Sequence, residues 1–312
     1  MRFQNSPSWF PYSYYNGGMN SLRALTDINL DDLVSSFGWQ DYPLPAWLLR
    51  QVFHAPAARF ARQMLLFDDF VGKTGLPGGA GHTLRDFAQK VQVFGDENVP
   101  VAGPVLFLSN HPGMVDTLAL FAAINRSDLR IIALNRPFLL SLPNMTKHLL
   151  FISDDPAGRV SAVKKAASHL RAGGAVLTFP AGHIEPDSDV YPGALESLRD
   201  WTDSAGVFVR FAPKTTIVPT FVRGVLWEKA VKHPLTRFKK EREQREKLGA
   251  AFQLLAHIMF NVRPLKIRIQ FGKPITLDEV GSKEMNAIHA KIIERMSGLA
   301  KNDPRGSRLS VL

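Results

Sequence analysis

The stretch "PVLFLSNHPGMVDTL", residues 104–118, decides how this chain folds. Its apolar start predicts a buried strand from Pro104 to Ser109, and a helix is expected near residues 114–126. The turn between them contains Pro112, which suits the first position of a helix. In open α/β sheets, catalytic side chains gather where strands end. The turn is therefore a candidate position for a catalytic site.

The same alternation continues along the chain. Further strands are expected at 130–134, 175–179, 216–222 and 265–271, and further helices near 157–172, 192–202, 241–262 and 283–300. Strands that alternate with helices are typical of an α/β fold. We expect a mostly parallel central sheet flanked by helices, preceded by a helical extension.

The N-terminal third has a different pattern. Arginines and bulky apolar residues between Pro45 and Phe70 predict two short amphipathic helices, interrupted at Pro56. They pack either on the core or on an anionic membrane. The Gly- and Pro-rich residues 72–82 are expected to form a linker. The expected organisation is a flexible arm over 1–20, a helical extension over 21–85 and an α/β domain over 86–312.

Composition narrows the setting. The 312 residues are 45% hydrophobic, which predicts a large folded core, and the absence of cysteine excludes disulfides and cysteine nucleophiles and favours a cytoplasmic location. A net charge of +10 favours a polyanionic neighbour. The sequence contains no apolar run of the roughly 18 residues that a spanning helix needs. Nucleic acid is not expected as a partner, because no zinc-finger, RNA-recognition or basic-zipper pattern accompanies the charge.

His111 and Asp116 are the candidate catalytic pair. Residues five apart on a regular helix differ by about 140° around its axis, so His111 must lie in the turn before the helix. From there its ring can reach Asp116, whose carboxylate would fix the tautomer and make the other ring nitrogen a better general base. Neither residue has further ligands at a metal-binding spacing, so no metal is expected.

The residues around this pair resemble the first motif of the PlsC-like glycerolipid acyltransferases, Asn-His followed by Asp. Here the motif stands as Asn110, His111 and Asp116, and residues 91–113 are similar to the strand and turn that lead into it in that family. The resemblance implies that Asn110 and Gly113 help to bind substrate. Backbone N–H groups around Gly113 or Gly182 are candidate donors to the oxyanion.

The stretch "VLTFPAGHIEP", residues 176–186, is similar to the family's Phe-Pro-Glu-Gly-Thr-Arg motif, in a degenerate form. Phe179, Pro180 and Gly182 match and are expected at the substrate site. Ala181 replaces the glutamate, and His183 and Ile184 replace Thr-Arg. Since the lost Glu and Arg would hold the acceptor's glycerol-phosphate, Glu185 is the favoured replacement, with Asp187 and His183 as alternatives.

Two further stretches extend the resemblance. The family's phosphate-binding Arg is represented by Arg159, displaced onto the start of a helix, where a cation can meet an anion. Residues 215–224 are similar to a fourth motif, a strand interrupted by proline. The resemblance covers roughly residues 90–275.

The resemblance implies transfer of an acyl group from acyl-CoA or acyl-carrier protein to a lysolipid or glycerol-phosphate in phospholipid biosynthesis. No cofactor is expected beyond the acyl donor as co-substrate. The partners would be these substrates and an anionic membrane surface, and the protein would be cytoplasmic and peripheral on the inner face of the membrane. The alternative is a non-catalytic lipid-binding protein on an acyltransferase scaffold, which the altered third motif favours.

Overall fold

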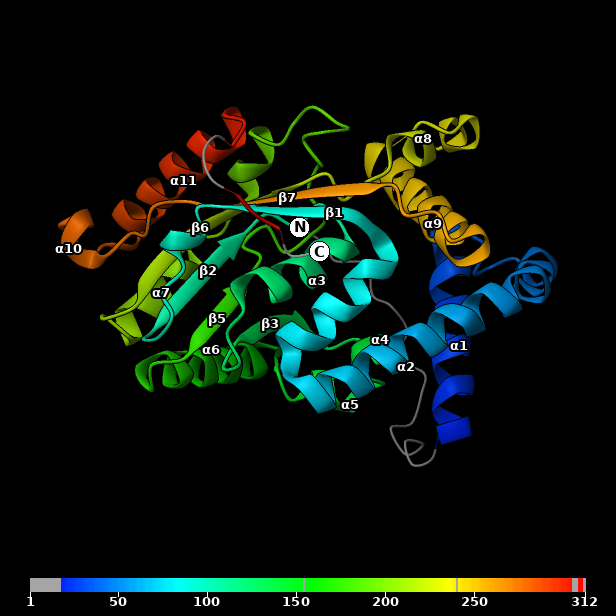
Figure 1. Cartoon of the computed structure of the whole chain (residues 1–312), viewed down its shortest axis with the longest axis horizontal. Helices are drawn as coiled ribbons and strands as arrows, with labels where there is room; N and C mark the ends of the chain where they lie inside the picture. The colour runs from blue at the N-terminus through cyan, green and yellow to red at the C-terminus, as the bar shows by residue number, and fades with distance from the viewer. Residues whose placement is uncertain (1–17, 154, 240, 305–307, 311–312) are drawn as a thin grey trace.

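The sheet forms the middle of three layers (Figure 1). The computed structural model describes residues 18–153, 155–239, 241–304 and 308–310. In this described part of the chain, eight strands run in the order β4-β3-β5-β2-β6-β7-β1-β8, with helices on both faces. The expected α/β fold with a mostly parallel sheet and N-terminal helices is confirmed.

The five strands expected between residues 104 and 271 are present within a residue or two of their expected ends. The strands are β1 (Ala88–Phe94), β2 (Val105–Ser109), β3 (Arg130–Leu134), β4 (Leu149–Ile152), β5 (Ala175–Thr178), β6 (Thr216–Arg223), β7 (Leu265–Phe271) and β8 (Arg308–Ser310). The five strands from β4 to β6 in the sheet are parallel. The strand direction then reverses, because β7 is antiparallel to β6. β1 is parallel to β7, and β8 is antiparallel to β1.

Side chains of β2 divide the core into two clusters, because successive strand residues point to opposite faces. Val105 and Phe107 join a cluster with α2 and α3. Leu106 and Leu108 join the cluster on the other face, with α6 (Pro156–Arg171), α7 (Ser204–Phe211) and α11 (Met285–Lys301). Since all four side chains are buried, β2 lies at the centre of the molecule, and the turn that follows it is firmly anchored.

The helices and shorter turns surround this sheet. They are α1 (Gly18–Phe37), α2 (Pro43–Phe87), α3 (Met114–Ile124), α4 (Pro137–Leu140), α5 (Pro143–Thr146), α6 (Pro156–Arg171), α7 (Ser204–Phe211), α8 (Glu228–Val231), α9 (Arg242–Phe260), α10 (Leu277–Val280) and α11 (Met285–Lys301), with 3-10 turns η1 (Asp96–Asn98), η2 (Glu196–Asp200) and η3 (Pro234–Phe238). The part of the expected flexible arm over 1–17 lies outside the described residues, and 18–20 begin α1. No helix among the described residues is long and apolar enough to cross a membrane.

The expected linker over residues 72–82 is wrong, because this segment belongs to α2. The helix bends at Gly75, whose φ of 77° is easily adopted by glycine. Beyond the bend, a Cβ on Gly79 would lie 2.7 Å from the backbone nitrogen of Val71. The glycines therefore allow a sharp bend and close packing instead of a flexible connection.

Two helix predictions also need correction. The helix continues through Pro56 without a break, because Pro56, Phe60 and Met64 form a buried face whose packing offsets the hydrogen bond that proline removes. The helix expected over 192–202 is reduced to the short turn η2. Ser197 in that turn donates its hydroxyl to Glu185, so tertiary hydrogen bonding shapes the segment.

Candidate active site

His111 and Asp116 lie together at the carboxyl end of β2. The strand ends at Ser109 and α3 starts at Met114, so His111 is in the turn between them. Its Nδ1 atom is 2.9 Å from Oδ2 of Asp116. The structure thus brings the two residues into the geometry that the five-residue spacing predicts.

Asp116 anchors this turn from the first turn of α3. Its side chain has no exposed surface. Oδ2 also accepts a hydrogen bond from the backbone N–H of Gly113 at 3.0 Å, and Oδ1 accepts one from the hydroxyl of Thr117 at 2.9 Å. A carboxylate with several donors is held in one orientation. The carboxylate therefore fixes the direction of the His111 ring.

The chemistry of His111 follows from this contact. Because a carboxylate accepts, Nδ1 carries the proton and leaves Nε2 able to accept one. The side chain of His111 is 25% exposed, so reagents can reach it. Burial is the largest effect on its pKa and lowers it, but the charge and hydrogen bond of Asp116 and the charge of Glu185 together outweigh burial and raise the pKa above 6.5.

The turn after β5 packs directly on His111. β2 and β5 are parallel neighbours, so their carboxyl ends lie side by side. The ring of Phe179 stacks on the imidazole with centroids 4.4 Å apart. Pro180 is buried behind it, and Gly182 closes the turn at a φ of 69°, donating its N–H to the carbonyl of Phe179. The two motifs seen in the sequence therefore form one site.

Asn110 does not face a substrate, which corrects its expected binding role. Its side chain is buried. The amide donates to the carbonyl of Val222 at 2.9 Å and accepts from the N–H of Val222 at 2.7 Å. Both contacts join the end of β2 to β6, so Asn110 is a positioning residue.

Glu185 was expected to bind the acceptor, and its burial contradicts this. The side chain is 1% exposed and accepts hydrogen bonds from His111, Ser197 and Trp201. The carboxylate of Asp187 is likewise buried and binds backbone N–H groups of residues 224–226. Of the three proposed replacements, His183 remains exposed, with Nε2 3.5 Å from Asp200.

Among the backbone N–H groups in the turns considered for the oxyanion, those of the two glycines themselves are already used. Gly113 donates to Asp116 and Gly182 donates to Phe179. Neither N–H is therefore available in this conformation to stabilise a developing negative charge. A Cβ at Gly113 would lie 3.5 Å from Val225 in the loop after β6, which is an ordinary van der Waals contact, so space does not require glycine there.

Arg159 lies at the same edge of the sheet as His111 but is not in contact with it. It is an exposed residue in the first turn of α6, which follows β4. β3 and β5 separate β4 from β2, which corresponds to about 14 Å between strand axes. A phosphate contact by Arg159 therefore requires an acceptor that extends across the edge of the sheet.

Several residues of the site give no local signal in the sequence. Ser197, Trp201 and Val222 reach it from elements far along the chain, and each is recognisable only through its hydrogen bonds to Glu185 or Asn110. Within the described residues, no group of three or more His, Cys, Asp or Glu side chains is arranged to hold a metal ion.

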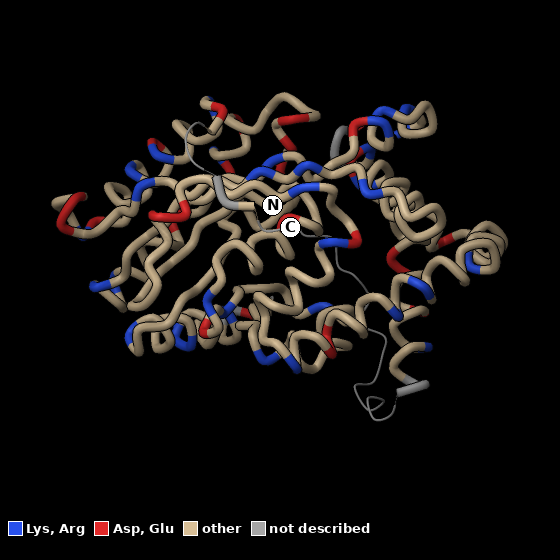
Figure 2. Tube along the Cα trace, in the orientation of Figure 1, with Lys and Arg blue, Asp and Glu red and all other residues tan. Residues whose placement is uncertain are grey.

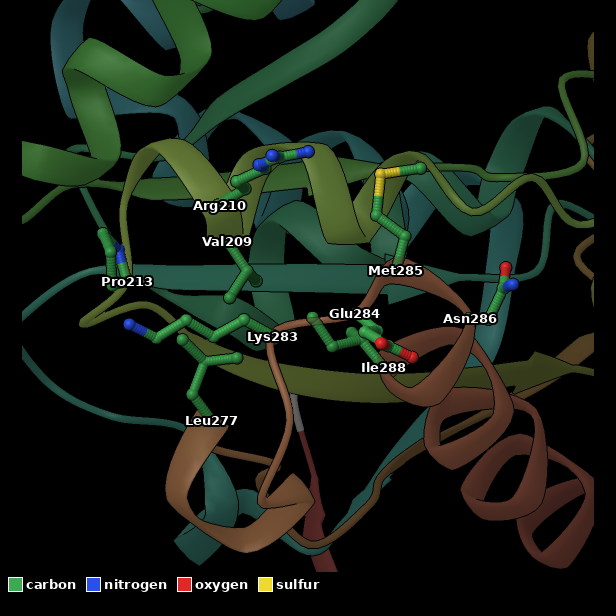
Figure 3. Close-up of a pocket in the computed structure, with 9 residues that line it drawn as sticks. All are labelled: Val209, Arg210, Pro213, Leu277, Lys283, Glu284, Met285, Asn286 and Ile288. Atoms are coloured by element: carbon green, nitrogen blue, oxygen red, sulfur yellow. The ribbon is translucent and has the colours of Figure 1, made fainter.

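A cavity of about 640 Å³ lies elsewhere, between α7 and the segment that contains α10 and the start of α11 (Figure 3). Val209 and Leu277 line it with the cationic side chains of Arg210 and Lys283. His111 and Phe179 do not line this cavity, so it is separate from the candidate active site.

Comparison with known proteins identifies the domain. Residues 90–223 match the family model described as Acyltransferase. The chain is similar to a solved structure titled "Crystal Structure of the 1-acyl-sn-glycerophosphate (LPA) acyltransferase, PlsC, from Thermotoga maritima", at 16% identity and a TM-score of 0.42, covering 91% of this chain and 95% of that chain. The comparison of this chain with curated proteins found no match. The matched range contains His111, Asp116 and the turn after β5, so the candidate active site lies within the part of the chain that matches the acyltransferase family model.

Proposed function

We propose that this acyltransferase moves a fatty acyl group from acyl-CoA or acyl-carrier protein to the hydroxyl of glycerol-phosphate, a lysophospholipid or a related lysolipid. The observation that carries the proposal is the 2.9 Å contact between Nδ1 of His111 and buried Asp116, which leaves Nε2 as a base on a partly exposed ring. Such an arrangement suits removal of a proton from a hydroxyl.

The reaction proceeds by direct transfer. Nε2 of His111 takes the proton of the acceptor hydroxyl as its oxygen bonds to the thioester carbonyl carbon. The tetrahedral intermediate then collapses, the carbon–sulfur bond breaks, and the imidazolium returns the proton to the leaving thiolate. Asp116 stabilises the imidazolium between these steps. The products are the acylated acceptor and the free thiol of the donor.

The acceptor would be held by contacts other than those of the family's third motif. Ala181 and Ile184 cannot replace the charges of Glu and Arg. Glu185 and Asp187 are buried in hydrogen bonds within the protein. His183, exposed in the turn after β5, and Arg159, at the start of α6, remain as cationic or donor groups that support phosphate recognition.

The pH dependence of kcat/KM tests the role of His111. A general base must be neutral in the free enzyme, so activity is expected to fall as the pH drops through the pKa of His111. Because the pKa of His111 is raised, the midpoint of the acid limb is expected above 6.5. A rate profile measured from pH 5 to 9 checks this, and a midpoint below 6.5 would contradict the assignment.

An acyl-transfer assay identifies the substrates. Purified protein is given labelled acyl-CoA or acyl-carrier protein with glycerol-3-phosphate and a panel of lysolipids. Product from one donor and acceptor would support the proposal. Folded protein that binds the lysolipids but yields no product from either donor would favour the lipid-binding alternative.

We also propose that the protein works at an anionic membrane surface on the cytoplasmic side, as a peripheral protein. Large exposed side chains gather in the turn between α1 and α2 and in the first turns of α2. This apolar patch consists of Trp39, Tyr42, Leu44, Trp47, Leu48 and Val52. Trp and Tyr are favoured at the membrane interface. The net charge of +10, with Lys and Arg spread over many of the surrounding helices (Figure 2), supports attraction to anionic lipid.

Charge placed in the apolar patch is expected to weaken membrane binding. Replacing Trp47 and Leu48, which are 55% and 50% exposed, with glutamate should reduce partitioning to phosphatidylglycerol-containing vesicles by about 10-fold or more. Vesicle sedimentation measures this, with Val101→Glu, at another exposed apolar residue, as the matched control. Equal loss in both variants would show that the patch has no special role.

A further inference from the structure

Glu185 places a buried carboxylate directly beneath the turn that carries His111. Its Oε2 atom accepts a hydrogen bond from the backbone N–H of His111 at 3.1 Å. Its Oε1 atom accepts from the indole N–H of Trp201 at 2.9 Å and from the hydroxyl of Ser197 at 3.1 Å. Two N–H groups therefore donate to its two oxygens, and the single hydroxyl proton of Ser197 is shared between Oε1 and the carbonyl of Ala194 at 3.0 Å.

The backbone of Glu185 makes a second connection to the same residue. Its N–H donates to the carbonyl oxygen of His111 at 2.9 Å. Glu185 thus occupies both the main-chain donor and the main-chain acceptor of His111. These contacts fix the main chain of His111, while Asp116 and Phe179 fix its ring.

The hydrogen bonds favour the ionised form of Glu185, because the N–H groups of His111 and Trp201 can only donate to it. Burial is the largest effect on the pKa of Glu185 and outweighs the donors on Trp201, His111 and Ser197 and the nearby charge of His183, so the pKa is raised above its usual 4.5. A buried carboxylate is costly for folding unless it is well satisfied. His111 becomes cationic when it takes up a proton during the reaction, so a negative charge on Glu185 would stabilise that state.

We propose that Glu185 is a positioning residue for the acyl-transfer reaction, holding the His111 main chain and stabilising the imidazolium by its charge. This proposal rests on the proposed function, in which His111 is the general base. The charged groups that face His111 are Asp116 on α3 and Glu185 after β5, and His183 faces Glu185 from the same turn.

Two substitutions at Glu185 separate the effect of its negative charge from the effect of its side-chain length. Glu185→Gln keeps the shape but removes the charge and turns an amide N–H toward one of the three donors. It should lower the pKa of His111 and reduce kcat about 10-fold. Glu185→Asp keeps the charge but is too short to hold the same partners. It should reduce kcat similarly and leave the pKa of His111 close to that of the wild type.

The matched control is Asp187→Asn. Asp187 is a second buried carboxylate two residues further on, but its bonds go to the backbone of Gly224, Val225 and Leu226. The variant removes a buried charge from the same segment without removing a hydrogen bond to His111. Its stability should fall, while the pKa of His111 should stay at the wild-type value.

The pKa of His111 is measured by NMR titration of the full-length protein labelled at histidine carbon atoms, with the His111 signal assigned from a His111→Gln spectrum, and kcat by the acyl-transfer assay. A lower pKa in Glu185→Gln alone, with reduced kcat in both Glu185 variants, supports the proposal. An unchanged pKa in Glu185→Gln, or the same shift in Asp187→Asn, overturns it. The titration needs no turnover, so absence of acyl transfer in the wild type would refute the proposed function separately.

Discussion

Replacement of His111 with alanine is expected to reduce kcat for acyl transfer by about 10³- to 10⁴-fold, because the reaction loses its general base. The turn can hold alanine, since its backbone hydrogen bonds to Glu185 do not depend on the imidazole. Substrate binding should change little. Steady-state kinetics with the donor and acceptor found in the assay would measure this loss.

The matched control is His289→Ala on α11, which removes a histidine from a helix outside the candidate active site. Its kcat should equal that of the wild type. If His111→Ala retained more than about a tenth of wild-type turnover, general-base catalysis by His111 would be wrong. Circular dichroism of both variants would show that the comparison is between folded proteins.

His111→Ala also has a predictable effect on stability. Because the folded-state pKa of His111 is raised above 6.5, its titration stabilises the protein fully below that value and ceases to do so as the pH rises through the folded-state pKa. The loss of Tm relative to wild type should therefore be larger at pH 5.5 than at pH 9.

Asp116→Asn is expected to have the second largest effect, a reduction in kcat of about 10² to 10⁴. Both Nδ1 of His111 and the Gly113 N–H bond to Oδ2, so an amide oxygen in that position still accepts both hydrogen bonds but carries no full negative charge. The imidazolium that forms during the reaction therefore loses its charged partner, and the amide NH2 takes the place of the oxygen that accepts from Thr117. Binding of lysolipid should remain close to wild type.

A pH-rate profile distinguishes this role from general damage to the fold. The charge of Asp116 raises the pKa of His111, so its removal should move the acid limb of kcat/KM to lower pH. Equal turnover at all pH values in wild type and variant would remove Asp116 from the mechanism. A reduced rate with an unshifted limb would instead indicate loss of ring orientation without an electrostatic role.

The alternating apolar runs were sufficient to predict the layers of the fold. β3 and β7 begin and end at the expected residues, because a buried strand between turn-forming residues has a strong local pattern. The prediction of a linker over 72–82 was wrong because glycine and proline occur both in loops and where helices pack closely. The contacts of Gly79 with Val71 decide between the two, and they depend on the bend in α2.

At the site, the sequence by itself determined that His111 lies in a turn before a helix and that Asp116 can reach it, since both follow from the helical repeat. Only the tertiary structure decided which polar side chains face the protein interior. Asn110 binds Val222 on β6, and Glu185 binds His111 and Trp201. These partners are many residues apart, and a hydrogen bond between neighbouring strand ends depends on the order of strands in the sheet, which no local pattern contains.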